Sequence, residues 1–214
     1  MQIIRQKHLL GTRWFHWINF PLLAIMIWSG FLIYWAFPTY FIGPIRFPNS
    51  VFQALHMDHK LTDGMAMYFV FMWLFILNGI LYVAYTIFSG EWRLLVPRSF
   101  STFRDAWHVA LHDLHLRKQK PPQNKYNAAQ QVSYSAIIIM GIGSVVTGLA
   151  IYKPAQLYWL AALFGGYPTA RLIHFSLTIG YCVFFLIHVL QVMLAGWNNF
   201  RSMVIGYELV DEHE

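Results

Sequence analysis

The chain has 214 residues, of which 57% are hydrophobic and only 11% are charged, and its formal net charge is +6. These values lie outside the usual range of soluble domains, so the composition excludes a soluble protein and indicates an integral membrane protein. The basic excess is not accompanied by an interleaved aromatic and basic module, so we expect no nucleic-acid partner and assign the positive charge to contact with the lipid bilayer.

Four apolar runs are long enough to cross a bilayer, which takes roughly 20 helical residues. They cover residues 14–37, 65–88, 133–152 and 172–197. The first run is too long and too aromatic for a cleaved signal peptide, so we expect it to be a retained span. The sequence therefore predicts an all-α integral membrane four-helix bundle, in which residues 1–214 form a single domain.

Two shorter segments outside the spans are predicted to be helices at the membrane surface. Residues 101–116 place apolar side chains at helical spacing, which is typical of a helix lying along the inner surface. Residues 153–168 are bounded by Pro154 and by the pair Gly165 and Gly166, and they predict a short helix at the outer surface.

The distribution of Lys and Arg predicts the orientation in the membrane. The N-terminal tail and the connection between the second and third spans are rich in basic residues: Arg5, Lys7, Arg13, Arg93, Arg98, Arg104, Arg117, Lys118, Lys120 and Lys125. The only basic residues in the connections after the first and third spans are Arg46, Lys60, Lys153 and Arg171. Because basic loops stay inside, we expect both termini in the cytoplasm.

The fourth span contains two histidines, His174 and His188, one toward each end. An ionisable side chain inside a span is a functional-site hypothesis by default. Fourteen helical residues advance the chain by ~21 Å and leave the two side chains roughly 40° apart around the axis. Axial ligands of two stacked haems need this arrangement. The alternative is that each imidazole only hydrogen-bonds a neighbouring helix.

A third histidine, His16, lies just inside the cytoplasmic end of the first span, in the segment "RWFHW". His188 lies some eight residues before the cytoplasmic end of the fourth span, so the depths of the two side chains match to within about two helical turns. We therefore predict that His16 and His188 form one bis-imidazole site. The alternative reading places His16 in the aromatic belt beside Trp14 and Trp17.

Three arginines lie near these histidines along the chain. Arg171 precedes His174 by one helical turn, and Arg13 and Arg201 flank the inner pair. Anionic haem propionates would bind such cations at the membrane surface. Each arginine is equally explained as an interfacial anchor of its helix.

The quoted residues resemble a known family. The strings "RWFHW", "WLFILNGILYVAYTIFSGEW", "GGYPTARLIHF" and "IHVLQVMLAGWNNFRSMVIGYE" are similar to the bacterial four-helix di-haem cytochrome b subunits of nickel–iron hydrogenases, formate dehydrogenases and thiosulfate reductases, in particular the branch that accompanies periplasmic molybdopterin oxidoreductases. The resemblance implies two non-covalent b haems with His16, His174 and His188 as axial ligands. The only cysteine, Cys182, excludes covalent attachment through Cys-x-x-Cys-His.

The second span departs from the family pattern. Relatives resemble "GMAWHF" where this chain has "GMAMYF", which puts Tyr68 at the place of a histidine. Counting depth from the inner ends of the spans leads to the same position. The second ligand of the outer haem is therefore open: His59 or His56 if the preceding loop folds back, Tyr68 as a phenolate, or none if the haem is five-coordinate or missing. We favour His59.

The resemblance implies a bacterial inner-membrane protein that relays electrons between membrane quinone and a periplasmic redox partner. The substrate chemistry would belong to that partner, and this chain would carry out one-electron transfer and quinone oxidation or reduction. Two other classes stay open: a membrane anchor without haem, and a small transporter with a histidine proton relay.

The outer connections suggest where a partner would dock. Residues 34–47 and residues 158–167 are rich in aromatic side chains and are bounded by Pro and Gly. Exposed apolar surface beyond a span usually marks an interface. We expect the redox partner at these two segments.

Overall fold

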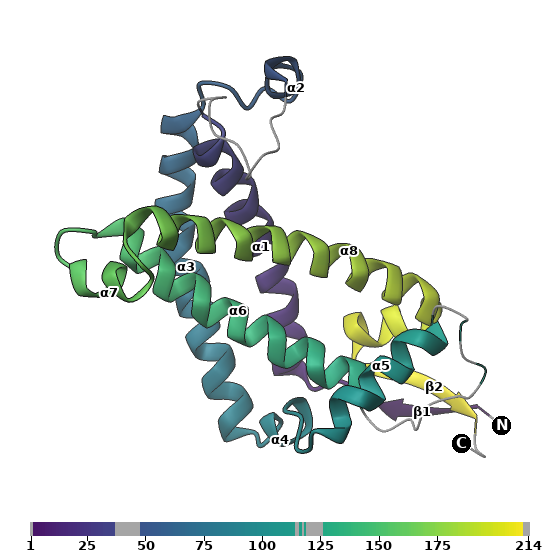
Figure 1. The fold of residues 1–214 in the computed structure, drawn as a ribbon. Coiled ribbons are helices and arrows are strands. Elements are labelled where there is room, and N and C mark those ends of the chain that lie inside the picture. The colour runs from purple at the N-terminus through teal and green to yellow at the C-terminus, as the bar shows by residue number, and fades with distance from the viewer. Residues whose placement is uncertain (1, 37–47, 114–115, 117, 119–125, 212–214) are drawn as a thin grey trace. The chain divides into compact units, whose positions relative to one another are not determined.

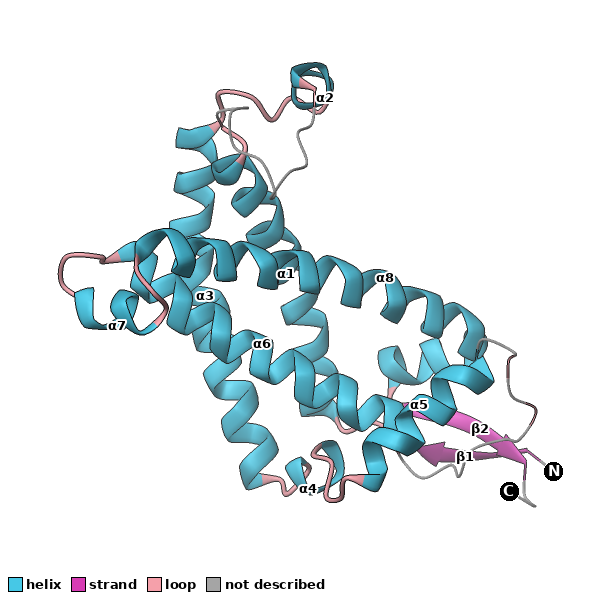
Figure 2. Ribbon diagram, in the orientation of Figure 1, coloured by secondary structure: helices cyan, strands magenta, loops and turns pink. Residues whose placement is uncertain are grey.

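Four long helices dominate the computed structural model, which describes residues 2–36, 48–113, 116, 118 and 126–211 (Figures 1 and 2). They are α1 (Leu10–Tyr34), α3 (Leu61–Phe88), α6 (Ala128–Tyr152) and α8 (Tyr167–Ile205). Each is long and apolar enough to cross a membrane. The predicted all-α fold with four spans is therefore confirmed.

Apolar side chains cover the outer surface of these helices. On α3, Val70, Leu74, Leu77 and Ile80 are all exposed, and their spacing of three to four residues puts them on one face of the helix. A continuous exposed apolar stripe is unfavourable in water and favourable against lipid tails. This face of α3 is therefore suited to contact lipid.

Four short helices lie between the long ones: α2 (Asn49–Ala54), α4 (Trp92–Leu95), α5 (Ser101–Asp113) and α7 (Tyr158–Leu163). Helices α5 and α7 lie in the two segments that the sequence predicted to be helical. Their placement at the membrane surfaces stays a prediction. Helices α2 and α4 were not predicted.

A two-stranded antiparallel ribbon joins the ends of the chain (Figure 2). Strand β1 (Gln2–Gln6) pairs with β2 (Tyr207–Asp211), in a register that runs from Gln2 opposite Asp211 to Gln6 opposite Tyr207. The pairing holds the two strands together, and an even number of spans is consistent with this because it puts both on the same side of the membrane. Which side of the membrane they face stays a prediction.

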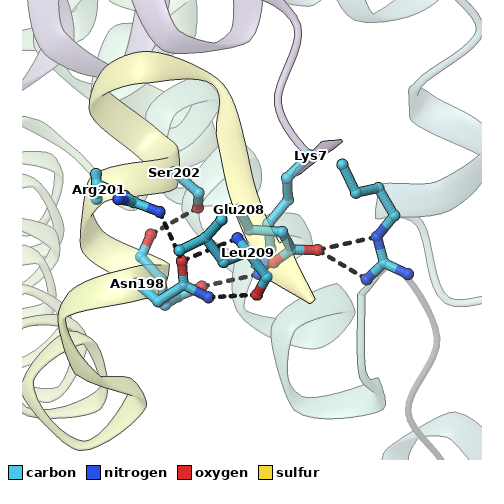
Figure 3. A network of polar contacts seen from close by, with 8 residues as sticks. Lys7, Asn198, Arg201, Ser202, Glu208 and Leu209 are labelled. Carbon is cyan, nitrogen blue, oxygen red and sulfur yellow. Dashed lines mark hydrogen bonds and ion pairs between the residues drawn. The ribbon is translucent and has the colours of Figure 1, made fainter. Parts of the chain in front are cut away.

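Polar contacts fasten this ribbon to the end of α8 (Figure 3). The Glu208 carboxylate forms ion pairs with Lys7 and Arg5, in which Lys7 Nζ and Arg5 Nη2 each lie 2.7 Å from a carboxylate oxygen. The Asn198 side chain donates to the Leu209 carbonyl at 2.8 Å and accepts from the Leu209 N–H at 3.1 Å. Burial alone would raise the pKa of Glu208, but the hydrogen bonds and charges of Lys7 and Arg5 outweigh burial and hold that pKa below its ordinary value.

The chain forms two compact units, which are described separately. One comprises Met1–Tyr82 and Phe184–Glu214, and the other Val83–Val183. In the first, α1 and α3 approach closely at Gly64, where an added Cβ would lie 2.9 Å from the Cβ of Leu32. Small residues permit such approach between membrane helices.

The core of the second unit lies where α6, α7 and the start of α8 meet. It consists of Ala150, Leu160, Ala161 and Ala170. Small side chains at three of these four positions let the short helix α7 pack tightly on its neighbours. This packing fixes the position of the end of α6.

Local signals set two of the helix ends. A capping box starts α6: Asn127 Oδ1 accepts from the Gln130 N–H at 2.9 Å, and Gln130 Oε1 accepts from the Asn127 N–H at 3.0 Å. The helix thus begins at Ala128, before the predicted start at residue 133. Within α8 the backbone leaves helical geometry at Gly196 (φ 80°), a conformation that favours glycine. This break coincides with the predicted end of the fourth span.

Candidate functional site

The structure brings His16 and His188 together. His16 projects from α1 and His188 from α8, and their ring centroids are 6.0 Å apart with an interplanar angle of 55°. Both side chains are half-buried. The structure therefore places the two imidazoles near each other, and their role as ligands stays a prediction.

This separation suits two axial ligands of one iron. A metal–imidazole bond is roughly 2 Å long and the ring centre lies ~1.1 Å behind the nitrogen, so two imidazoles on opposite sides of an iron have centres roughly 6 Å apart. Because each ring plane contains the iron–nitrogen axis, the two planes can take any angle about that axis. The observed 6.0 Å and 55° both satisfy this geometry.

Aromatic rings surround the pair. Phe184 stacks on His188 at 5.8 Å with an angle of 6°, and Trp17 meets His16 edge-on at 5.2 Å. Phe20 and Phe185 stack on each other at 6.0 Å, from the same two helices. Such walls are flat and apolar, which suits a porphyrin and would keep water from its metal.

The buried Nδ1 atom of His16 has no hydrogen-bond partner. Burying a polar nitrogen without a partner is costly. If His16 served only to join helices, this nitrogen would be expected to bond a neighbouring helix. The observation therefore disfavours a purely structural role for His16.

Two predicted arginines lie near the ends of α1 and α8 in this unit. Arg13 Nη1 donates to the Val204 carbonyl at 2.6 Å, and Arg201 Nη2 donates to Asn198 Oδ1 at 3.2 Å. The Nε atoms of both arginines are buried and have no hydrogen-bond partner. Arg13 thus joins α1 to the end of α8, and Arg201 bonds within the last turns of α8 itself.

His174 lies in the second unit and contacts α6. Its Nδ1 atom is 2.9 Å from the hydroxyl oxygen of Thr147. A Cβ added to Gly148 would lie 3.3 Å from His174 Cε1. Gly148 makes room for this imidazole. Arg171 is half-buried one turn before His174 on α8.

The other predicted ligands lie on α3 and on the turn before it. Tyr68 is half-buried on α3, where a Cβ added to Gly30 of α1 would come within 3.7 Å of its ring. His56 and His59 are exposed and have positive φ angles of 52° and 57°. The His59 N–H donates to the Ala36 carbonyl at 3.0 Å, which ties the turn to the end of α1.

Comparison with known proteins identifies the family. A family model described as prokaryotic cytochrome b561 matches residues 7–206. The chain belongs to this family. A protein of Azospira oryzae named "Putative protein-methionine-sulfoxide reductase subunit YedZ1" is 31% identical over 193 residues, which cover 90% of this chain and 92% of the relative.

Membership of a cytochrome b561 family implies a b-type haem, and the inner site fits that group through the spacing of His16 and His188, the aromatic walls and the unpartnered Nδ1 of His16. Four spanning helices in a prokaryotic family make the chain a multi-pass protein of the bacterial inner membrane. The resemblance that the sequence suggested is confirmed.

Thr147 and Phe184 contact the candidate ligands and were missed by the sequence analysis. Thr147 carries a signal that would have revealed it, because a buried hydroxyl in the middle of a span needs a partner. Phe184 precedes His188 by one helical turn, but phenylalanine is too common in these spans to single out.

Proposed function

We propose that the chain relays electrons between membrane quinone and a periplasmic redox partner through two non-covalent b haems. The inner haem would be held by His16 of α1 and His188 of α8. The outer haem would be held by His174. The observation that carries the proposal is the 6.0 Å separation of the two inner imidazoles, in a chain of the cytochrome b561 family.

At the inner site, a b haem would supply an iron that cycles between the ferric and ferrous states. His16 and His188 would hold it low-spin from both faces, and the surrounding aromatic rings would exclude water. The positive charges of Arg13 and Arg201 would bind the propionates at the cytoplasmic surface.

The outer haem needs a second ligand besides His174. We propose His59. The alternatives are His56, which precedes α3 as His59 does, and Tyr68 on α3. Arg171, one turn before His174, would bind a propionate of this haem. The non-helical turn before α3 supports a histidine ligand, because a regular helix would hold both histidines beyond the membrane surface.

The partner is proposed from the named relative. Its name describes a subunit of a methionine-sulfoxide reductase. We propose a periplasmic oxidoreductase of the molybdopterin type as the partner of this chain. If that partner is a reductase, electrons would leave quinol at this chain and pass outward, two per substrate molecule.

Replacement of His188 by alanine tests the proposal. We expect His188→Ala to lose one low-spin haem and quinol-linked reduction of the partner, because one iron loses an axial ligand. Haem content would be measured by reduced-minus-oxidised absorbance of the purified complex. His112→Ala is the control, because His112 lies on α5, outside the four spans. Full haem content and turnover in His188→Ala would contradict the assignment.

A further inference from the structure

Thr147 on α6 is buried, with a side chain only 1% exposed, and its hydroxyl makes two short contacts. It donates to the Gly143 carbonyl one turn earlier at 2.6 Å. It also lies 2.9 Å from Nδ1 of His174 and 3.4 Å from the Ser144 carbonyl, and the backbone of Ser144 is a second hydrogen-bond partner of the His174 ring. All four residues belong to the same compact unit.

The first contact decides the direction of the second. A threonine hydroxyl has one hydrogen and two lone pairs. If the hydrogen points to the Gly143 carbonyl, only a lone pair faces His174. Nδ1 of His174 must then carry the proton and donate it to Thr147. In a neutral imidazole this leaves the lone pair on Nε2, which is the form that binds a metal.

Two further features restrict the ring. Threonine is stiff at χ1 in a helix, and the bond to the preceding turn holds its hydroxyl in place. Gly148, the next residue, lies against the same edge of the imidazole, where a Cβ would be 3.3 Å from Cε1 and 3.8 Å from Nδ1. The orientation of the ring is therefore set from α6.

We propose that Thr147 is a positioning residue that holds His174 in the Nδ1-protonated form and tunes the outer haem. The inference rests on the proposed function, because it takes His174 to be an axial ligand. Hydrogen bonds from a ligating histidine to an acceptor fix its tautomer and raise its basicity. A more basic ligand favours ferric iron and so lowers the midpoint potential.

The test compares Thr147→Val with Thr147→Ser in the purified complex. Valine keeps the shape and removes the hydroxyl, whereas serine keeps the hydroxyl. We expect Thr147→Val to weaken haem binding at the outer site roughly 10- to 100-fold. We also expect it to raise the midpoint potential of that haem and to shift its low-spin EPR signal. Thr147→Ser should restore both, and the inner haem should not change.

Thr178→Val is the matched control. Thr178 follows His174 by one turn on α8, and its hydroxyl donates to the His174 carbonyl at 3.2 Å, so it touches the main chain and not the ring. We expect no change of potential or EPR signal in this variant. An equal shift in Thr178→Val would mean that loss of any nearby hydroxyl suffices, and it would overturn the proposal.

The remaining outcomes separate this proposal from the proposed function. Two haems with unchanged potentials and spectra in Thr147→Val would overturn the role of Thr147 and leave the relay intact. A shift that Thr147→Ser fails to restore would assign the effect to shape and overturn the proposal as well. A haem content in His174→Ala equal to that of the unaltered protein, whether one haem or two, would overturn both the outer haem and the role of Thr147.

Discussion

His56 and His59 adopt a backbone conformation that favours glycine. Their φ angles of 52° and 57° lie in the left-handed region, which is unfavourable for most side chains. Strain of this kind persists where the surrounding structure requires it, and it often marks functional sites. Two histidines in such positions, on the turn that precedes α3, support a role for one of the imidazoles.

EPR of ligand variants can identify the second ligand of the outer haem. We expect His59→Ala to lose one of two low-spin bis-histidine EPR signals, because its iron loses a nitrogen ligand. Tyr68→Phe and His56→Ala, which alter the two alternative ligands, should leave both signals unchanged. Loss of a signal in His56→Ala and not in His59→Ala would assign the ligand to His56. His59→Gly relieves the backbone strain and should still lose the signal.

The contrary results are distinct for each ligand. A ferric high-spin signal in the unaltered protein would mean an open site or a phenolate. Loss of that signal in Tyr68→Phe would assign the ligand to Tyr68. A single haem per chain would remove the outer site altogether.

Among the elements, the ribbon of β1 and β2 depends on the charge of Glu208. Its folded pKa lies below the ordinary value, so the ribbon gains stability from the ionised form at every pH above the unfolded pKa of about 4.3. The gain is lost as pH falls below that value and through the folded pKa. The charge therefore stabilises the ribbon at neutral pH and not in acid.

We expect amide protection of strands β1 and β2 to fall between pH 6 and pH 3.5. Because Arg5 is 59% exposed and screened by solvent, the change should be only roughly two- to fivefold in the opening equilibrium. Hydrogen exchange with mass spectrometry measures it. The control is Glu208→Gln, which should show the lower protection at both pH values. An equal pH response in this variant would assign the effect to other groups.

The elements differ in how far the sequence predicts them. The four spans follow from hydropathy, because lipid requires a long apolar helix wherever the chain crosses. The ribbon does not follow from hydropathy, because its two five-residue strands lie at opposite ends of the chain and form only by pairing with each other. The start of α6 was within reach, since Asn127 and Gln130 form a recognisable capping box.

The same distinction applies to the candidate site. His16 and His188 were predicted as partners because the depth of a residue in the membrane can be estimated by counting helical residues from the end of its span. Thr147 and His174 were not paired, because their contact depends on how α6 and α8 are rotated about their axes. Rotation is fixed by side-chain packing, to which Gly143 and Gly148 contribute, and apolar sequences specify it weakly.

At the scale of the whole molecule, counting spans puts α7 and α5 on opposite sides of the membrane. The chain crosses an odd number of times between the described N-terminus and α7, and an even number before α5. The positive-inside rule predicts that α7 is periplasmic. Of the two predicted docking segments, residues 158–167 are described, and residues 37–47 of the other segment lie outside the described residues.

The last prediction is that the redox partner binds at α7. Tyr158, Trp159 and Leu163 are between 61% and 74% exposed, and this apolar surface lies on the predicted periplasmic side. We expect a photo-crosslinking residue at position 159 to capture the periplasmic oxidoreductase in intact membranes. Exposed aromatic surface beyond a span is suited to such an interface, since its burial is favourable.

Trp107 on α5 provides the matched control, because it is 63% exposed and Trp159 is 61% exposed. The same crosslinker at position 107 should not capture the periplasmic subunit. Crosslinks to lipid alone at position 159 would make α7 an interfacial anchor. Capture of the partner only at position 107 would reverse the predicted orientation, and with it the side of the membrane on which His174 would pass electrons to the partner.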